Sequence, residues 1–321
     1  MEEVSVIIPN YNGKAYIRGC LDALFRQSIK EFEIIAIDNG STDGSSEIIA
    51  QEYPDVRLLC LDKNYGFCRA VNEGIRASQN PYVLLLNNDT EAEEYFVEEM
   101  LRGIKKNKKC FSCQAKLIQF YDRTKTDDAG NFYSALGWAY AKGKGEPESR
   151  FQKERTIFAA CGGAAVYRKS LMKKIGYFDE EHFAYLEDLD IGYRARIYGY
   201  QNLFLPSARV YHVGSGTSGS RYNSFKVRCS ARNNIYLLYK NMPVLQIIWN
   251  FPLLLLGFVI KVLFFVKKGF GKEYLTGMKE GIFLCLKNKK NVKKVPFLWK
   301  NIGNYLKIQG ELYLNILRKF K

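Results

Sequence analysis

Four short apolar runs in the first 90 residues, separated by segments with helical spacing, constrain the fold of this chain more than any other feature. Each run is apolar over nearly its whole length, which is typical of a strand buried on both faces. The runs are VSVIIP (4–9), FEIIAID (32–38), VRLLCLD (56–62) and YVLLLN (82–87). The alternation of strand and helix predicts an α/β fold, with a mostly parallel, twisted sheet that has helices on both sides.

The turns that follow three of these runs are rich in side-chain oxygen. In open parallel sheets the ligand binds beyond the carboxyl ends of the strands, so these turns should lie at the binding edge. The chain has neither GxGxxG after its first strand nor GxxxxGK[ST], which removes the main support for a dinucleotide or P-loop site. An oxygen-rich edge instead suits a hard divalent cation that itself holds phosphate. The residues are Asn10, Asn12, Asp38, Asn39, Asp43, Asn87, Asn88 and Asp89.

A second group of chemically capable residues lies between positions 158 and 216. LEDLDIGYRAR places Glu187, Asp188 and Asp190 in the first turn of an expected helix, and Gly162–Gly163 allows close backbone approach. Acids at a helix start also complement the macrodipole, and Asp190 can pair with the arginine four residues later. That structural explanation fits Asp190 better than the adjacent Glu187 and Asp188, because neighbouring residues on a helix point about 100° apart.

The two histidines of the chain receive different interpretations. His212 ends an expected strand before a Gly/Ser loop, where it is either a ligand or a hydrogen-bonded core histidine. His182 stands in an acidic loop, and we expect it to be solvated.

Together these stretches resemble the family 2 glycosyltransferases, nucleotide-sugar enzymes with the GT-A fold and a Rossmann-like nucleotide-binding half. The resemblance covers roughly residues 3–216 in the expected order, and the late YH is most similar to bacterial rhamnosyltransferase-type members that build surface polysaccharides. The matching stretches are VSVIIPNYNG, FEIIAIDNGSTDGS, NYGFCRAVNEGI, YVLLLNNDT, CGGAAVYRKS and FAYLEDLDIGYRARIYGY.

The resemblance implies a role for each matching position. NND stands in place of the family's DxD-type motif, so Asp89 matches the ligand of a divalent metal, Mg²⁺ or Mn²⁺, and His212 matches a second ligand found in some members. Asp188 matches the catalytic base of the ED motif, with Glu187 beside it. The matching donor-binding residues are Pro9, Tyr11, Asn12, Asp38, Asn39, Asn64 and Asn88.

The implied function is inverting transfer of a sugar from a nucleotide-diphosphate sugar, of dTDP-rhamnose or UDP-sugar type, to a glycan or lipid-linked acceptor. One base opposite one metal-bound leaving group implies a single displacement. A nucleotidyltransferase is the rival enzyme, but NYNGKAY is not the basic Gly-rich loop that it needs. An inactive scaffold is the other rival, against which the presence of both Asp89 and Asp188 argues. Residues 120–157 form either an acceptor loop, with Trp138 and Tyr140 as sugar platforms, or an ordinary surface loop.

The net charge of +15 lies entirely in the last part of the chain. Residues 1–225 hold 29 Lys+Arg and 30 Asp+Glu, whereas residues 226–321 hold 19 Lys+Arg and 3 Glu. We therefore expect a catalytic domain at 1–225 and a basic, largely helical region at 226–321. Such a basic region binds polyanions. Because it shows no zinc or RNA-binding signature, we expect its partner to be an anionic membrane and not a nucleic acid.

An apolar segment at 241–266 makes a membrane the expected partner. Its uncharged part is just long enough to cross a bilayer core of ~30 Å, but a single crossing would move 15 Lys+Arg to the far side, against the positive-inside tendency. We expect the segment to lie in the interface at the cytoplasmic face of the cell membrane. The alternatives are a crossing helix and a helix buried against the catalytic domain. The N-terminus MEEVSVIIPN shows no secretory signal pattern.

Overall fold

The computed structural model describes residues 3–214, 222–288 and 294–320. Its strands, in chain order, are β1 (Val4–Asn10), β2 (Glu33–Asp38), β3 (Arg57–Cys60), β4 (Tyr82–Leu86), β5 (Thr90–Ala92), β6 (Cys110–Gln119), β7 (Thr126–Asp128), β8 (Asn131–Tyr133), β9 (Ala139–Ala141), β10 (Arg155–Ile157), β11 (Ala164–Arg168) and β12 (Gln201–His212).

The helices are α1 (Ile17–Phe25), α2 (Ser45–Glu52), α3 (Phe67–Ala77), α4 (Phe96–Lys105), α5 (Lys169–Ile175), α6 (Glu187–Ile197), α7 (Ser224–Asn241), α8 (Val244–Lys267), α9 (Gly271–Asn288) and α10 (Ile302–Phe320). Three short 3₁₀ turns are η1 (Glu148–Arg150), η2 (Glu180–His182) and η3 (Trp299–Asn301).

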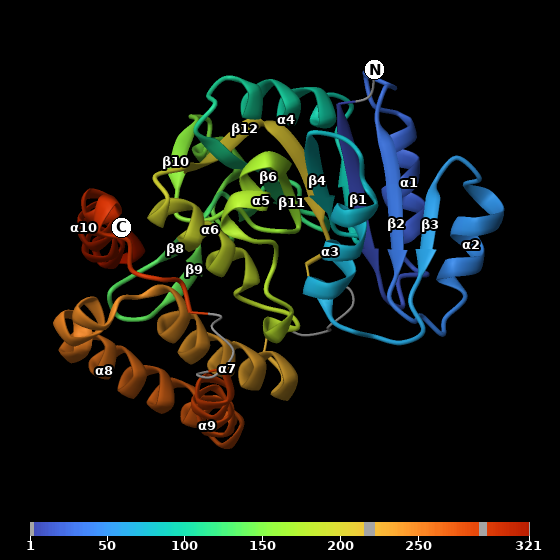
Figure 1. The fold of residues 1–321 in the computed structure, drawn as a ribbon. Helices are drawn as coiled ribbons and strands as arrows, with labels where there is room; N and C mark the ends of the chain where they lie inside the picture. Colours follow the sequence, from blue (N-terminus) through green and yellow to red (C-terminus); the bar gives the residue numbers. More distant parts are fainter. Residues whose placement is uncertain (1–2, 215–221, 289–293, 321) are drawn as a thin grey trace.

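One large sheet runs through the molecule in the order β10-β12-β6-β11-β4-β1-β2-β3, with β5 and β7 paired outside this path (Figure 1). The predicted parallel pattern holds in the half built from the first 90 residues, where β4, β1, β2 and β3 are parallel neighbours. β11 then pairs antiparallel with both β4 and β6, so the other half of the sheet is mixed. The predicted α/β fold with a central sheet between helices is confirmed.

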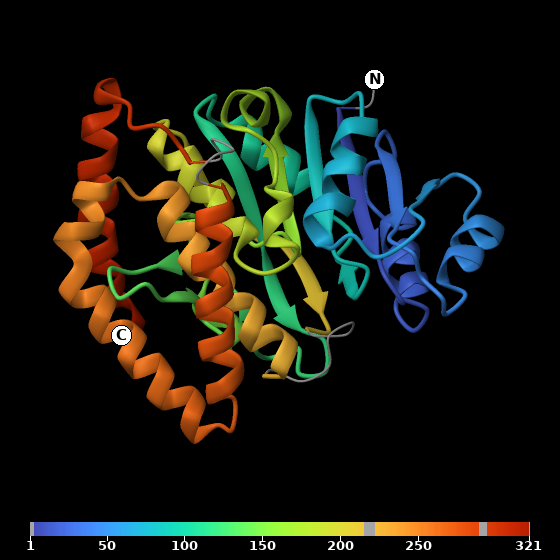
Figure 2. The same cartoon turned by 60° about the horizontal axis from the view of Figure 1, so that its bottom comes forward.

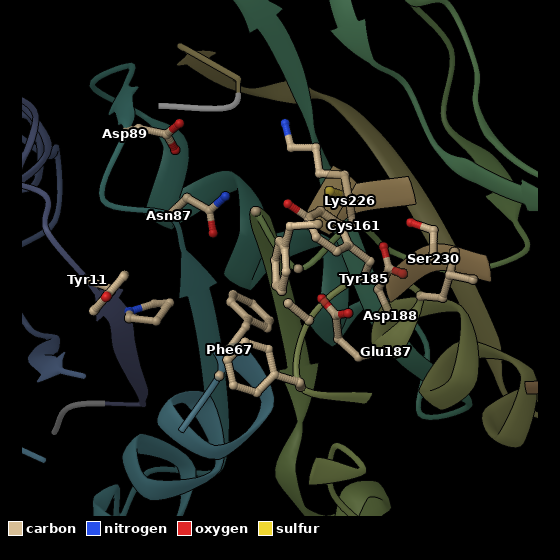
Figure 3. A pocket seen from close by; sticks show the side chains of 18 of the residues that line it. Tyr11, Phe67, Asn87, Asp89, Cys161, Tyr185, Glu187, Asp188, Lys226 and Ser230 are labelled. Carbon is tan, nitrogen blue, oxygen red and sulfur yellow. The ribbon is translucent and has the colours of Figure 1, made fainter. Parts of the chain in front are cut away.

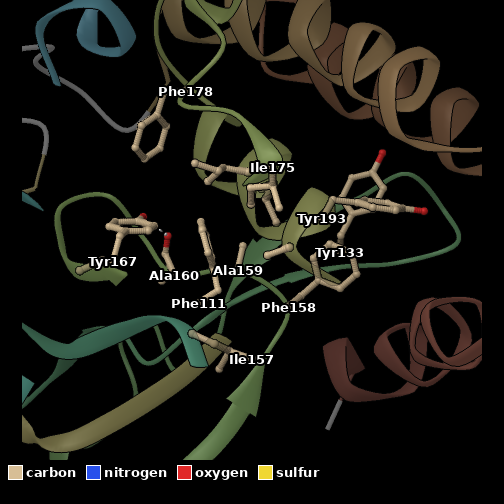
Figure 4. Close-up of a cluster of buried hydrophobic side chains, with 14 of the residues drawn as sticks. Phe111, Tyr133, Ile157, Phe158, Ala159, Ala160, Tyr167, Ile175, Phe178 and Tyr193 are labelled. Atoms are coloured by element: carbon tan, nitrogen blue, oxygen red, sulfur yellow. Dashed lines mark hydrogen bonds between the residues drawn. The ribbon is translucent and has the colours of Figure 1, made fainter. Parts of the chain in front are cut away.

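Successive side chains of the strands pack alternately into two separate hydrophobic cores, one on each face of the sheet. Val6 and Ile8 of β1 pack with α1, α2 and α4 on one face, whereas Ile7 packs with α3 on the other. This alternation follows from the two-residue period of a strand, and it explains why apolar residues occupy both faces of these runs over most of their length. The second face continues into an aromatic cluster beneath α5 and α6 (Figure 4). There the ring of Tyr167 lies 5.6 Å from the rings of both Phe111 and Phe178.

Residues 120–157 are not an ordinary surface loop, because most of the segment from Thr126 to Leu136 is buried. The segment contains the β8–β9 hairpin, which lies against the C-terminal helices (Figure 2). The Trp138 indole donates a hydrogen bond to the carbonyl of Gly257 in α8, and the Tyr140 hydroxyl donates to the carbonyl of Asn315 in α10. Both aromatic side chains therefore help to attach the C-terminal helices.

A buried charge network joins α7 to α6 across the proposed boundary at residue 225. Asp190 is fully buried and accepts hydrogen bonds from Arg194 at 2.8 Å, Lys240 at 2.9 Å and Asn241 at 2.7 Å. Burial alone would raise the pKa of Asp190, but Arg194 and Lys240 outweigh burial and hold it well below the usual range. The division of the chain at 225 stays a prediction, and α7, which begins at Ser224 and spans this position, packs on α6.

Replacement of Asp190 tests how much this network stabilises the fold. Asp190→Ala leaves two buried cations without their carboxylate, which typically destabilises a protein by about 3–5 kcal/mol. Asp122→Ala is the matched control, because Asp122 forms an exposed pair with Lys125 at 2.8 Å that should be worth about 1 kcal/mol or less. Urea unfolding in mild detergent measures both. Equal losses of unfolding free energy in Asp190→Ala and Asp122→Ala would contradict the stabilising role of the buried network.

Candidate active site

A cavity of about 1000 Å³ lies at the carboxyl ends of β1, β2 and β4, where the sequence places the binding edge (Figure 3). We call it the reaction cavity. The turn after β4 is part of this cavity, because its three residues Asn87, Asn88 and Asp89 all line it. Nine of the predicted site residues line it, namely Pro9, Tyr11, Asn39, Asn64, Asn88, Asp89, Glu187, Asp188 and His212.

Asn10 fixes the loops that surround the donor side of the reaction cavity. Its side chain is fully buried, donates to Asp38 at 2.9 Å and to Ser45 at 2.8 Å, and accepts from Asn88 at 2.8 Å. A Cβ at Gly13 would come within 2.3 Å of this amide pair, so only glycine allows the NYNG turn to approach it. The amides at the ends of β1 and β4 therefore brace each other.

Two predicted donor-binding residues lie outside the cavity lining. Asp38 is buried behind it, where its carboxylate accepts hydrogen bonds from Asn10 and from the backbone of Ser41. Asn12 is exposed, has a positive φ of 49° and accepts from the backbone of Thr42 at 2.9 Å. Asp38 and Asn12 thus stabilise the loops after β1 and β2. Neither lines the cavity, so their contact with the donor stays a prediction.

Asp89, in the turn after β4, and His212, at the end of β12, lie next to each other. Oδ1 of Asp89 lies 3.4 Å from Nε2 of His212, while Nδ1 of His212 lies 2.8 Å from Oδ2 of Asp127. Burial alone would lower the pKa of His212, but these two carboxylates outweigh burial and raise it to about 9. His212 is thus no ordinary core histidine, because both of its ring nitrogens face carboxylates.

The donor set fits Mg²⁺ or Mn²⁺ held partly by substrate. Within the described residues no group of three or more His, Cys, Asp or Glu side chains is arranged to hold a metal by itself. Mg²⁺ is usually bound through one or two carboxylates together with substrate phosphates and waters, so a full protein cage is not required. Asp89 supplies such a partial set at the cavity wall, and His212 beside it would contribute Nε2 as a neutral imidazole, without the proton that its carboxylate neighbours favour.

The acid pair stands on the opposite side of the reaction cavity, at the start of α6 (Figure 3). The preceding loop is strained, because Phe183, Tyr185 and Leu186 all have φ between 60° and 70°. Non-glycine residues adopt such angles only where surrounding contacts impose them. Here Asn233 of α7 places its amide nitrogen 2.7–2.9 Å from the carbonyl oxygens of residues 182, 184 and 185.

Burial tunes both carboxyl groups of the pair. It raises the pKa of Asp188 to about 7, opposed by hydrogen bonds from the backbone of Leu189 and from Asn131 at 2.7 Å. Burial and the neighbouring Asp188 also raise the pKa of Glu187, whose Oε2 is buried and has no hydrogen-bond partner among the described residues. A carboxylate with a pKa near neutrality is well suited to accept a proton from a hydroxyl group.

Comparison with known sequences assigns the chain to a family. The model described as Glycosyl transferase family 2 matches residues 5–176, more than half of the 321 residues. The chain belongs to glycosyl transferase family 2. The match includes β1, β2, β4 and the Asn87–Asp89 turn, so the first half of the reaction cavity lies within it.

Relatives of this family 2 chain include bacterial enzymes of cell-surface glycans. An N-acetylglucosaminyl-diphospho-decaprenol L-rhamnosyltransferase of Mycobacterium tuberculosis is 26% identical over 67% of this chain and 77% of its own length. A poly-beta-1,6-N-acetyl-D-glucosamine synthase of Staphylococcus epidermidis is 25% identical over 77% of this chain and 58% of its own. The chain thus resembles the rhamnosyltransferase-like members, as the sequence motifs predict.

Solved structures share the GT-A fold with this family 2 chain. GalNAc-T7, crystallised with UDP, GalNAc and Mn²⁺, superposes with a TM-score of 0.60 at 16% identity, over 74% of this chain and 48% of that chain. S. aureus TarS 1-349 in complex with UDP gives 0.52 at 19% identity, over 78% of this chain and 69% of that chain.

Three polar residues of the site escaped the sequence analysis. Asn131 donates to Asp188, Asp127 contacts His212, and Lys226 of α7 lines the reaction cavity. The first two lie in the 120–157 segment, whose short strands carry no clear period, and Lys226 is the first residue of the proposed tail. Only the tertiary fold brings all three residues to the site.

The prediction of a solvated His182 is wrong. His182 is fully buried, and its ring lies 5.3 Å from that of Tyr236 in α7. Burial lowers the pKa of His182 to about 4, so it is a neutral core residue. Acidic neighbours in the sequence suggested exposure, but Arg69, Arg76 and Lys240 pair with those acids. Of the two platform candidates, Tyr140 lines the reaction cavity and Trp138 does not.

We expect Asp89→Asn to abolish metal-dependent binding of a nucleoside diphosphate without loss of fold. The change is nearly isosteric but removes the carboxylate charge that faces the cavity. Calorimetric titration of UDP with Mn²⁺ measures the binding. Asp43→Asn, at a residue that does not line the cavity, is the control. Unchanged affinity in Asp89→Asn would overturn the metal assignment.

We expect acceptor-dependent turnover to rise as pH increases through about 7, because the base must lose its proton. Asn131→Ala removes a hydrogen bond to the charged form of Asp188, so it should move the rise to higher pH. The pH dependence of UDP binding serves as the control and should not move with this variant. An unshifted turnover profile would show that Asn131 does not set the state of the base.

Proposed function

We propose that the chain is an inverting, metal-dependent glycosyltransferase. It moves a sugar from a nucleotide-diphosphate sugar, of dTDP-rhamnose or UDP-sugar type, to a hydroxyl of a glycan or lipid-linked saccharide in surface polysaccharide synthesis. One observation carries the proposal: the reaction cavity has Asp89 and His212 on one wall and Asp188 on the other. A leaving group and a base must face each other across the sugar carbon in a single displacement.

The residues of the chain divide the chemistry between the two walls. Asp188 accepts the hydroxyl proton as the acceptor oxygen bonds to the sugar carbon, and the bond from that carbon to the diphosphate oxygen breaks on the opposite side. Asn131 holds the carboxylate in position for this step. A bound divalent cation supplies Lewis-acid stabilisation of the departing diphosphate. Asp89 and His212 are the residues that would hold it.

The raised pKa of Glu187 fits an accessory role. A carboxyl group that keeps its proton can donate a hydrogen bond to an acceptor oxygen, while the adjacent Asp188 remains ionised. Such divided protonation is how neighbouring acids take separate roles. Asp188 is the better candidate for the base, because it has the hydrogen bond from Asn131 that Glu187 lacks.

The names of the relatives support the substrate classes. The mycobacterial relative is named for transfer of L-rhamnose to a diphospholipid-linked N-acetylglucosamine, and the TarS fragment is solved with UDP. These names favour a nucleotide-sugar donor and a lipid-linked acceptor for this chain too.

A nucleotide-sugar panel tests the proposed reaction. We expect one nucleotide-sugar to be hydrolysed slowly with Mn²⁺ and no acceptor, and we expect Asp188→Asn to cut acceptor-dependent turnover by about 10²-fold or more with donor affinity nearly unchanged. Glu187→Gln should cost less activity. Released nucleotide is the readout. A larger loss in Glu187→Gln would show that the wrong acid was chosen, and no hydrolysis of any donor would refute the function.

We propose further that the C-terminal region holds the enzyme at the cytoplasmic face of the membrane. Among the described residues α8 is the helix that is long and apolar enough to cross a bilayer. Its buried residues are only Asn250, Leu254 and Gly257. The alternative of a helix buried against the catalytic domain is therefore not favoured, since Leu245 and Trp249 are more than 70% exposed.

The exposed apolar surface extends beyond the segment that the sequence indicates. Helices α9 and α10 add exposed Phe283 and Leu306, and exposed lysines at 267, 268 and 272 lie near the end of α8. This combination of apolar area with basic residues is typical of an interfacial attachment to anionic lipid.

Vesicle flotation tests the attachment. We expect binding to anionic vesicles that high salt weakens, and poor binding to neutral vesicles, because each lysine contributes about 1 kcal/mol that salt screens. Changing Lys267, Lys268 and Lys272 to Gln should weaken binding. The control changes Lys106, Lys108 and Lys109 beyond α4 to Gln and should not. Resistance to both salt and carbonate would favour a crossing helix instead.

A further inference from the structure

Two adjacent buried acids in β7 have different partners. Asp127 pairs with His212 and Lys144, whereas Oδ1 of Asp128 accepts a hydrogen bond from Gln114 of β6 at 2.9 Å. Successive residues of a strand point to opposite faces, so the two carboxylates lie on different sides of β7. Burial of a carboxyl group is costly, and it raises the pKa of Asp128 to about 6. The hydrogen-bond partners of Asp128 therefore identify what this buried acid stabilises.

Asp128 closes the turn that leads to Asn131. Its Oδ1 also accepts a hydrogen bond from the backbone N–H of Gly130, two residues later, at 2.6 Å, as in an Asx turn. Gly130 has a φ of 120°, and a Cβ there would lie 2.4 Å from the side chain of Ile157, so this path of the backbone requires glycine. The Asp128 carboxylate and the close packing on Ile157 together fix the conformation of the turn.

Asn131 follows the turn, and its backbone and side chain are both hydrogen-bonded. Its backbone N–H donates to the carbonyl of Ala159 at 3.3 Å, and its carbonyl accepts from the N–H of Phe158 at 3.1 Å. Its amide nitrogen donates to Oδ2 of Asp188 at 2.7 Å. The alignment of this last hydrogen bond therefore depends on where the turn at 128–130 places Asn131.

Gln114 connects the same carboxylate to the wall of the reaction cavity. Its Nε2 donates to Oδ1 of Asp128, and its Oε1 accepts from the backbone N–H of Cys161 at 2.8 Å. Cys161 lines the reaction cavity, as do Asn131 and Asp188. One buried oxygen of Asp128 thus joins the turn before Asn131 to the cavity wall.

We propose that Asp128 is a positioning residue for the base, because it fixes the turn that aims Asn131 at Asp188. Asp128 lies outside the lining of the reaction cavity, so it acts through Asn131 and not on the substrate. A hydrogen bond favours the ionised carboxylate only while donor and acceptor stay aligned, since its strength falls steeply with angle. This inference rests on the proposed transferase function, in which Asp188 is the base.

Asp128→Asn and Asp128→Ala separate the turn from the charge, because both lack the carboxylate charge but only the asparagine amide can accept from Gly130. At pH values above the rise of turnover, we expect Asp128→Asn to keep most of its turnover. Asp128→Ala should lose up to about 10²-fold, the cost of a reacting group displaced by about 1 Å. The rise should also lie at higher pH in Asp128→Ala than in Asp128→Asn, because ionised Asp188 loses an aligned hydrogen bond.

The remaining charges around Asp128 and Asp188 are identical in the two variants, so they do not affect this comparison. They belong to Glu187, Asp127, Lys144 and Arg155. NMR titration of the carboxyl carbon of Asp188 gives the same pH difference without any turnover.

A double-mutant cycle with Asn131→Ala tests the route. If Asp128 acts through Asn131, the turnover losses of Asp128→Ala and Asn131→Ala should not multiply in the double variant. Asp122→Ala is the matched control, because Asp122 accepts from the backbone N–H of Thr124 at 3.3 Å in the same kind of turn, in the loop between β6 and β7. Its turnover should not change. Mn²⁺-dependent UDP binding should be retained in every variant and shows that each is folded.

Equal turnover in Asp128→Asn and Asp128→Ala, or losses that multiply with Asn131→Ala, would overturn the proposal. Should Asp128→Ala fail to bind UDP, Asp128→Ser replaces it, because a serine hydroxyl accepts from the same N–H more weakly and should give an intermediate loss. Failure of the transferase function would appear separately, as a wild-type protein that turns over no nucleotide-sugar. The NMR titration would still decide the role of Asp128: equal Asp188 pKa values in Asp128→Asn and Asp128→Ala would overturn it.

Discussion

The buried carboxylate of Asp190 is the interaction on which the acid side of the site depends. It gathers Arg194 of its own helix and Lys240 of α7, and so fixes α7 against α6 without exposure to water. Once α7 is held there, its Asn233 can reach the backbone of the strained loop before α6. That loop presents Glu187 and Asp188 to the reaction cavity. A helix whose sequence belongs to the basic tail therefore completes the catalytic half of the molecule.

The donor side depends on a different kind of constraint, the geometry of parallel strands. β1, β2 and β4 end at one edge, so their polar turns must meet, and Asn10 joins them by hydrogen bonds to Asp38 and Asn88. β12 then brings His212 beside Asp89 from more than 120 residues away. The two sides differ electrostatically. Burial raises the pKa of Glu187 and Asp188 and so favours their protonated forms, whereas Asp127 and Asp89 stabilise a positive charge on His212.

Sequence patterns predicted the features that depend on interactions between residues close together in the chain. The four buried strands and the oxygen-rich edge follow from continuous apolar runs and the residues after them, and the Asp190–Arg194 pair follows from helical spacing. The antiparallel insertion of β11 was not predictable, because a five-residue strand does not specify its partners in the sheet. Asn131 and Asp127 were missed for a similar reason, since only long-range strand pairing brings them to the site. His182 was misjudged because acidic neighbours suggest exposure, whereas tertiary packing of α7 buries it.

We expect a donor diphosphate to bind between the turn after β4 and His212, facing Asp188 across the reaction cavity. A crystal structure with UDP and Mn²⁺, with the metal located by its anomalous scattering, tests this arrangement. We expect Mn²⁺ to be coordinated by Asp89 and the diphosphate, with His212 as its second protein ligand and Asp188 on the far side of the cavity. Mn²⁺ bound elsewhere, or a diphosphate that leaves Asp89 without contact, would contradict it.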